Sequence, residues 1–114
     1  MEAEENNGKP KGLKFDQGKN RPMLLMGQQA MPDAMRSIIE VLTIGAQKYD
    51  DNNWRYVDNK YDRYQDALLR HIHAYVGGEK FDPETGINHL SHAACNLLFL
   101  LQLDIEQGYE KREG

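Results

Sequence analysis

The sequence has one cysteine, no long apolar run and no excess of basic residues. A single cysteine excludes an intrachain disulfide, and the apolar context HAACNLLFLL indicates that Cys95 is a buried small side chain rather than a nucleophile. No segment approaches the roughly 18 to 20 apolar residues that span a bilayer, and the N-terminus lacks the apolar core of a signal peptide. These absences predict a soluble, cytoplasmic protein with no membrane partner.

The net charge and mean hydropathy of the chain indicate which classes of partner it is expected to bind. The chain carries 14 Lys and Arg against 18 Asp and Glu, a formal net charge of -4. Proteins that bind long nucleic acid draw much of their affinity from cationic contacts to phosphates, so long nucleic acid is not an expected partner. The mean hydropathy of -0.78 leaves apolar side chains for one modest core. We expect one domain whose core is completed in a homo-oligomer.

The N-terminal part of the chain changes character at Leu13. Residues 1–12 mix acids, Asn, Gly, Lys and Pro without periodicity, which predicts a disordered lead. The next stretch alternates briefly, and Gly18 and Pro22 punctuate it before the apolar run Met-Leu-Leu-Met. This pattern predicts a short extended arm that packs across the helices. The domain itself is expected at 13–108, with a flexible tail at 109–114.

The spacing of apolar residues predicts an all-α fold. Three helices are expected, at about 32–49, 59–76 and 87–107. Pro32 and Asp33 suit the start of the first helix, and Gly77 with Gly78 supplies the end of the second. The third helix is apolar on every side, so we expect it at the centre of the fold or at an oligomer interface.

Ionisable side chains that could meet a ligand are densest in residues 62–96, which hold all four histidines. His71 and His73 leave a helix about 200° apart and cannot bind one ion together. His89 and His92 share a helix face, but HxxH alone supplies neither a third ligand nor a general base. The candidates for a third ligand are Asp66, Asp82 and Glu84. We predict no metal and no cofactor; these histidines can instead hydrogen-bond a loop or a neighbouring subunit.

Basic and imidazole groups near this region predict a site for phosphate oxygens, because Arg binds them through a fork and Lys as a point charge. The candidates are Arg70, His71, His73, His89 and His92, with Lys14, Lys19 and Arg21 from the arm. A surface ion pair with Asp66 is the alternative for Arg70. Tyr49 and Trp54 could stack on a base, although a single tryptophan in a loop is more often an anchor to the core.

Three strings follow one another between Leu13 and Leu103: KFDQGKNRPMLL, GAQKYDDNNW and RYQDALLRHIHAYVGGEKFDPETGINHLSHAACNLLFLL. They resemble the phage-encoded family of dATP/dGTP diphosphohydrolase N-terminal domains, and the chain is also similar to a small nucleotide kinase of short-tailed coliphages. The resemblance implies a helical phage protein that binds phosphorylated nucleotides in the infected cell. The positions it carries over are Lys14, Asp16, Lys19, Arg21, Lys48, Tyr49, Asn53, Trp54, Arg70, His71, Glu79, Asp82, Glu84, His89, His92 and Asn96.

The chain departs from a related pattern of nucleotide hydrolysis. Helical pyrophosphohydrolases of the MazG type hold magnesium with ExxE on one helix and ExxD on the next, and the predicted helices here have neither pair. Imidazole is a poor substitute for the oxygen ligands that magnesium requires. We therefore expect a non-catalytic sponge that sequesters purine or cyclic signalling nucleotides of host immunity. The alternatives are a metal-sparing nucleoside monophosphate kinase, a dNTP pyrophosphohydrolase and a purely structural helical module.

Overall fold

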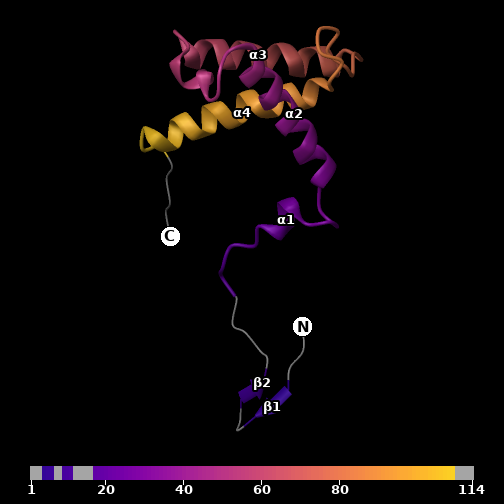
Figure 1. The fold of residues 1–114 in the computed structure, drawn as a ribbon, viewed down its shortest axis with the longest axis vertical. Coiled ribbons are helices and arrows are strands. Elements are labelled where there is room, and N and C mark those ends of the chain that lie inside the picture. The colour runs from indigo at the N-terminus through magenta and orange to yellow at the C-terminus, as the bar shows by residue number, and fades with distance from the viewer. Residues whose placement is uncertain (1–3, 7–8, 12–16, 110–114) are drawn as a thin grey trace.

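The computed structural model describes residues 4–6, 9–11 and 17–109, and the first two of these segments are described by their backbone alone. The described helices are α1 (Met23–Met26), α2 (Pro32–Lys48), η1 (Asn53–Tyr56, a 3-10 helix), α3 (Lys60–Val76) and α4 (His89–Glu106). Figure 1 shows that helices dominate the chain. The all-α class is confirmed, and α2, α3 and α4 match the three helices that the apolar spacing predicts.

Two short strands, β1 (Glu4–Asn6) and β2 (Lys9–Lys11), pair antiparallel with Glu5 opposite Pro10. The disordered lead expected at 1–12 stays a prediction, and the structure describes the backbone of only these two short strands within it.

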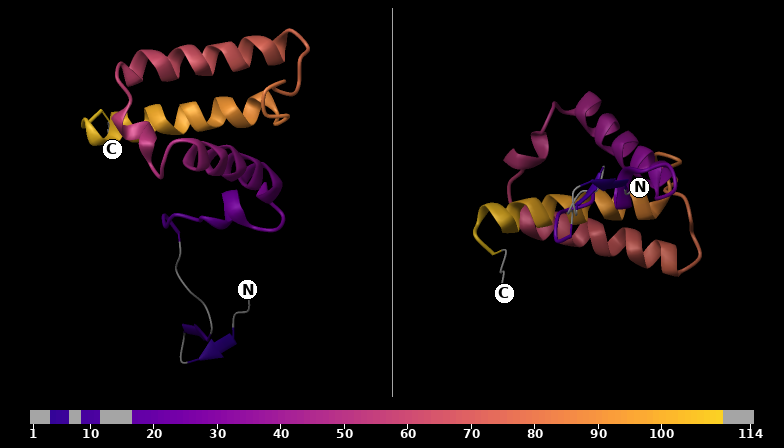
Figure 2. Two further views of the ribbon diagram at one scale, coloured as in Figure 1. Left: turned by 45° about the horizontal axis from the view of Figure 1, so that its top comes forward. Right: turned by 90° about the horizontal axis from the view of Figure 1, so that it is seen from below.

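The helical part is a hairpin of α3 and α4 with α2 crossing α4. Figures 1 and 2 show α3 and α4 side by side and running in opposite directions. Contacts between α2 and α4 include a hydrogen bond of 2.5 Å between the hydroxyls of Ser37 and Ser91. The Cys95 thiol donates to the carbonyl of Ile38 at 3.4 Å. Burial is concentrated on the inner face of α4, where Ala93, Cys95 and Leu103 are among the buried residues.

A cluster of three aromatic side chains packs η1 against α3 and α4. The rings of Trp54 and Phe99 stack with their centroids 4.8 Å apart, and the Phe99 and Tyr64 rings lie 4.9 Å apart. The Tyr64 hydroxyl donates to the Trp54 carbonyl at 2.6 Å. Trp54 also has the Arg55 guanidinium 4.6 Å from its ring centroid. The tryptophan therefore anchors its loop to the helices.

The arm differs from its prediction. Its apolar run forms the short helix α1 rather than an extended segment, and Met23, Leu24 and Met26 are 69%, 62% and 57% exposed. The described arm therefore does not bury these side chains across the helices. An apolar run without sustained alternation does not distinguish strand from helix, and Pro22 has a helical φ of -57° that is suited to the start of a helix.

The outer face of α4 keeps an apolar stripe exposed. Leu90, Leu97 and Leu101 follow one another at spacings of seven and four and are 41%, 54% and 52% exposed. The homo-oligomer expected from the sequence stays a prediction, and this stripe is the surface that it would cover. Among the described helices, none has the length and apolar content required to cross a membrane.

We expect the two faces of α4 to differ sharply in their contribution to stability. Leu103→Ala removes a side chain that is 6% exposed and should lower the free energy of unfolding by about 2 to 4 kcal/mol. The matched variant Leu101→Ala, on the outer stripe, should cost less than about 1 kcal/mol. Urea denaturation followed by circular dichroism measures both. Equal losses would show that the outer stripe is buried in solution, as it would be in an assembly.

Candidate functional site

Three of the four histidines meet at the end of the hairpin where α3, the connecting loop and α4 come together. His71 comes from α3, and His89 and His92 lie one turn apart at the start of α4. The His71 and His92 rings stack with centroids 4.6 Å apart and an interplanar angle of 10°, and the His89 ring is 5.1 Å from His71. We call these residues, together with Glu79, Asp82 and Thr85, the histidine cluster.

The loop before α4 is folded so that its acidic residues reach the imidazoles. Asp82 accepts hydrogen bonds at its Oδ2 atom from the Thr85 backbone N–H at 3.1 Å and from the Thr85 hydroxyl at 2.9 Å. The Gly86 N–H closes the turn on the Asp82 carbonyl at 2.7 Å, and Gly86 has a φ of +76° that favours glycine. The Asn88 side chain caps α4 by accepting from the N–H of Leu90 at 2.8 Å.

The Thr85 hydroxyl fixes the proton position on His92. Its single proton goes to the Asp82 carboxylate, because an ionised carboxylate can only accept. The Nε2 atom of His92, 2.7 Å from the Thr85 oxygen, must therefore donate to it. The N–H of Ile87 donates to the same oxygen at 3.2 Å. Thr85 thus holds His92 in the tautomer that carries its proton on Nε2.

Glu79 fixes the tautomer of His89 in the same way. The His89 Nε2 atom lies 2.8 Å from a Glu79 carboxylate oxygen, so Nε2 donates. The Nδ1 atom of a neutral His89 then carries a lone pair, and this atom faces Nδ1 of His71 at 2.8 Å. In the arrangement observed, His71 donates to that lone pair. His89 is 4% exposed and both of its nitrogens have partners.

The electrostatics of the cluster favour neutral imidazoles beside an ionised carboxylate. Burial lowers the pKa of His71, and the neighbouring His92 and His89 lower it further. Burial also lowers the pKa of His92, although Asp82 opposes this shift. Burial raises the pKa of Asp82, but the hydrogen bonds from Thr85 outweigh it, and the net pKa lies below the usual value. The cluster therefore offers lone pairs and negative charge rather than a cradle for an anion.

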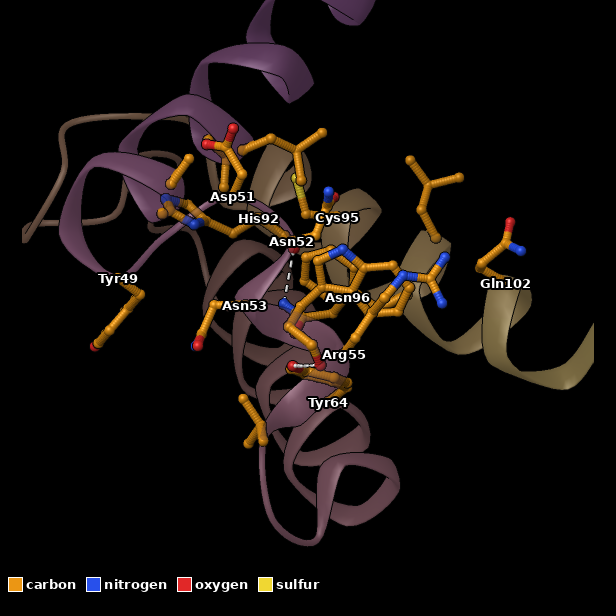
Figure 3. Close-up of a pocket in the computed structure, with 18 of the residues that line it drawn as sticks. Tyr49, Asp51, Asn52, Asn53, Arg55, Tyr64, His92, Cys95, Asn96 and Gln102 are labelled. Atoms are coloured by element: carbon orange, nitrogen blue, oxygen red, sulfur yellow. Dashed lines mark hydrogen bonds between the residues drawn. The ribbon is translucent and has the colours of Figure 1, made fainter. Parts of the chain in front are cut away.

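A cleft of about 1090 Å³ opens beside the cluster, between α2, residues 49–57 and α4 (Figure 3). The stacked Trp54 and Phe99 form part of its apolar lining. Its polar lining includes Asn52, Asn53, Arg55, Arg63, His92, Asn96 and Gln102. Asn96 donates from its side chain to the His92 carbonyl at 2.8 Å. His92 belongs both to this cleft and to the histidine cluster.

The structure places some of the candidate residues from the sequence in the cleft, some in the histidine cluster and some in neither. Those lining the cleft are Tyr49, Asn53, Trp54, His92 and Asn96, and those in the histidine cluster are His71, Glu79, Asp82, His89 and His92. Neither group contains Lys19, Arg21, Lys48, Arg70, His73 or Glu84, all of which are exposed. Lys48 lies over the Tyr49 ring, 5.3 Å from its centroid. Lys14 is outside the described residues.

Sequence reasoning missed several residues of the site, among them Thr85, Arg63 and Gln102. Thr85 was not nominated, although the string DPETG predicts the turn that places it against Asp82. Arg63 and Gln102 line the cleft, and nothing in their local sequence context distinguishes them from ordinary exposed helix residues. Their role depends on how α3 and α4 pack, which spacing alone does not specify.

Fold and site together define a small helical protein with a histidine–carboxylate cluster beside an open cleft. Residues 9–112 match the family model described as dATP/dGTP diphosphohydrolase, N-terminal, and the chain belongs to this family. A dATP/dGTP diphosphohydrolase of Salmonella phage PMBT28 is 39% identical over 92 residues, which is 81% of this chain and 29% of that relative. The chain thus spans less than a third of the relative's length. No solved structure matches the chain.

The hydroxyl of Thr85 should contribute more to the free energy of unfolding than the hydroxyl of an ordinary surface threonine does. Thr85→Val keeps the shape and the backbone hydrogen bond to Asp82, but removes the hydroxyl that donates to Asp82 and accepts from His92, which should cost about 1 to 3 kcal/mol of unfolding free energy. The control is Thr43→Val on α2, whose hydroxyl donates only to the exposed Ile39 carbonyl and should cost little. Chemical denaturation measures both. Equal, small losses would contradict the proton assignment at Thr85.

The Cys95 thiol should be unreactive until high pH. Burial disfavours the thiolate and raises the pKa of Cys95 from 9.0 to about 11, so the reactive fraction at pH 8 falls about a hundredfold. Alkylation by iodoacetamide, followed by mass spectrometry, should be slow at pH 8 and accelerate up to about pH 11. The same chain unfolded in urea is the control. Equal rates at pH 8 in both states would refute burial of the thiol.

Proposed function

We propose that this chain binds a purine deoxynucleoside triphosphate in the cleft between α2, residues 49–57 and α4, and acts in the turnover of dATP or dGTP. Two findings support the nucleotide class: membership of the family and the similarity to a phage protein named dATP/dGTP diphosphohydrolase. Because the chain covers 29% of that relative, binding is assigned to this chain first, and cleavage is tested separately.

The observation that carries the proposal is the position of His92, which joins a cleft of mononucleotide size to the histidine cluster. Ligand pockets commonly enclose roughly 300 to 1000 Å³, and this cleft is about 1090 Å³. Its side-chain amides at Asn53, Asn96 and Gln102 can each donate and accept, as recognition of a base edge or a sugar hydroxyl requires. Arg63 supplies a guanidinium suited to phosphate oxygens.

Diphosphohydrolysis of such a ligand breaks the bond between the α-phosphorus and its bridging oxygen. Water supplies the new oxygen on the α-phosphate, and pyrophosphate leaves. The reaction requires a group that accepts a proton from water, and an imidazole that is neutral near pH 7 can do so. Burial lowers the pKa of His92, which keeps its ring neutral at that pH. His92 is therefore our candidate for handling the proton at the cleft.

Sequestration without cleavage, the first expectation from the sequence, has less support. The family and the relative both carry the name of a diphosphohydrolase, which favours the hydrolytic alternative over a sponge for cyclic nucleotides. Binding and cleavage are separable by experiment. We therefore rank a role in dNTP hydrolysis first and sequestration second.

Isothermal titration with the four dNTPs and with cyclic dinucleotides tests the binding proposal. dATP or dGTP should bind at least about tenfold more tightly than dCTP or dTTP, a difference of about 1.4 kcal/mol. Arg63→Ala should weaken binding by about 1.5 to 3 kcal/mol, because a bond to a charged group is lost. The control Arg36→Ala removes an exposed arginine of α2 outside the cleft and should leave affinity unchanged.

Anion-exchange chromatography of the same incubations, with and without added divalent ions, tests cleavage. Release of dAMP or dGMP with pyrophosphate supports a hydrolase. Tight binding with recovery of the intact triphosphate would overturn the hydrolase role and support sequestration. Tightest binding of a cyclic dinucleotide, or no binding of any nucleotide, would overturn the proposal.

A further inference from the structure

We propose that His71, His89 and Asp82 bind one divalent transition-metal ion of the zinc type. One potential ligand atom from each of these side chains lies within 4.8 Å of the other two. The three come from separate segments: α3, the connecting loop and α4. The sequence predicted no metal because HxxH at 89–92 supplies no third ligand. It did not pair His71 with His89, which become neighbours only in the folded hairpin.

The imidazoles of His71 and His89 direct their Nδ1 atoms toward one position, where the ion would bind. Their Nδ1 atoms face each other at 2.8 Å, and Glu79 holds the proton of a neutral His89 on the opposite nitrogen. The His89 lone pair therefore already points at the proposed ion position. His71 needs only to move its proton from Nδ1 to Nε2 to offer a second lone pair. Binding requires no net loss of a proton from either ring.

The spacing of the donors suits a first-row transition metal. Two nitrogens bound tetrahedrally at about 2.05 Å from zinc lie roughly 3.3 Å apart, close to the 2.8 Å observed between the rings. A carboxylate oxygen completes a set of two imidazoles and one carboxylate, which leaves a coordination position for water or another oxygen ligand. Magnesium prefers more oxygen ligands and is a poorer match to two nitrogens.

The surroundings of the three side chains resemble the support that metal ligands receive in proteins. Glu79 accepts from the outer nitrogen of His89, the arrangement that commonly orients a metal-bound histidine. Thr85 donates twice to Asp82 and fixes its carboxylate. His89 is 4% exposed and the Asp82 side chain 14% exposed, so the donors are largely shielded from water.

A purely structural hydrogen bond between the two histidines is the competing explanation. It accounts for the 2.8 Å contact, with His71 as donor, and Asp82 then serves only the turn through its hydrogen bonds from Thr85. An anion is a poorer occupant, since Asp82 and Glu79 would repel it. The metal explanation uses all three potential ligands together with the carboxylate behind His89.

The proposed ion would lie close to the cleft, because His92 lines the cleft and stacks on His71 at 4.6 Å. The inference does not require nucleotide binding. A failed metal test would leave the proposed function standing, and a failed nucleotide test would leave the metal site standing.

The test uses the full chain without a histidine tag, stripped with EDTA, and then titrated with Zn²⁺ against a chromophoric chelator. We expect one equivalent of Zn²⁺ per chain, and Co²⁺ should give the visible absorption bands of a tetrahedral nitrogen–oxygen site. His71→Ala and Asp82→Ala should each weaken Zn²⁺ binding at least about tenfold. His73→Ala removes an exposed histidine from the same helix and should leave the affinity unchanged.

A second measurement on the unmodified chain covers the case in which a variant fails to fold. Diethylpyrocarbonate modifies free imidazole nitrogens, and peptide mass spectrometry locates the modified histidines. Zn²⁺ should protect His71 but not His73. Undiminished affinity in His71→Ala, absence of Zn²⁺ binding, or equal protection of His71 and His73 would each overturn the proposal.

Discussion

Two imidazole nitrogens that face each other at 2.8 Å, on His71 and His89, constrain the closed end of the helical hairpin. A buried polar atom without a partner costs about 1 to 3 kcal/mol, so the largely buried His89 must satisfy both of its nitrogens. One partner comes from α3 and the other, Glu79, from the loop. This requirement fixes the register of α3 against α4 and brings the loop back over the start of α4. The position of His92 beside the cleft follows from the same register.

The burial of His71 also explains why the basic residues named from the sequence do not join the cluster. Successive residues on a helix point about 100° apart, so turning His71 toward α4 directs Arg70 and His73 away from it. Both are exposed on α3. The cluster consequently combines imidazoles with carboxylates, a set suited to a cation. Under the proposed function, the phosphate oxygens of a nucleotide would instead meet Arg63 in the cleft.

Periodicity was sufficient to predict the long helices and the shared face of His89 and His92, because these properties depend on local spacing. It could not predict that Glu79 and Thr85 would become the partners of those histidines. Their contacts depend on how the loop folds and how two helices pack, which are not local properties. The prediction for the arm failed for a local reason instead. The run from Met23 to Met26 is compatible with both an extended and a helical conformation, and the structure has the helix where an extended segment was expected.

The apolar stripe of α4 adds a constraint on assembly. Leu103 is 6% exposed and Leu101 is 52% exposed, and they lie on opposite faces of one helix. The described elements that pack on α4 cover Leu103 and leave Leu101 largely exposed. A second copy over the stripe would cover Leu97 and Leu101 without disturbing the core, which gives the predicted homo-oligomer a physical basis. Because Leu101 also lines the cleft, such a copy would border the proposed nucleotide site. Assembly and ligand binding would then be coupled through the same side chain.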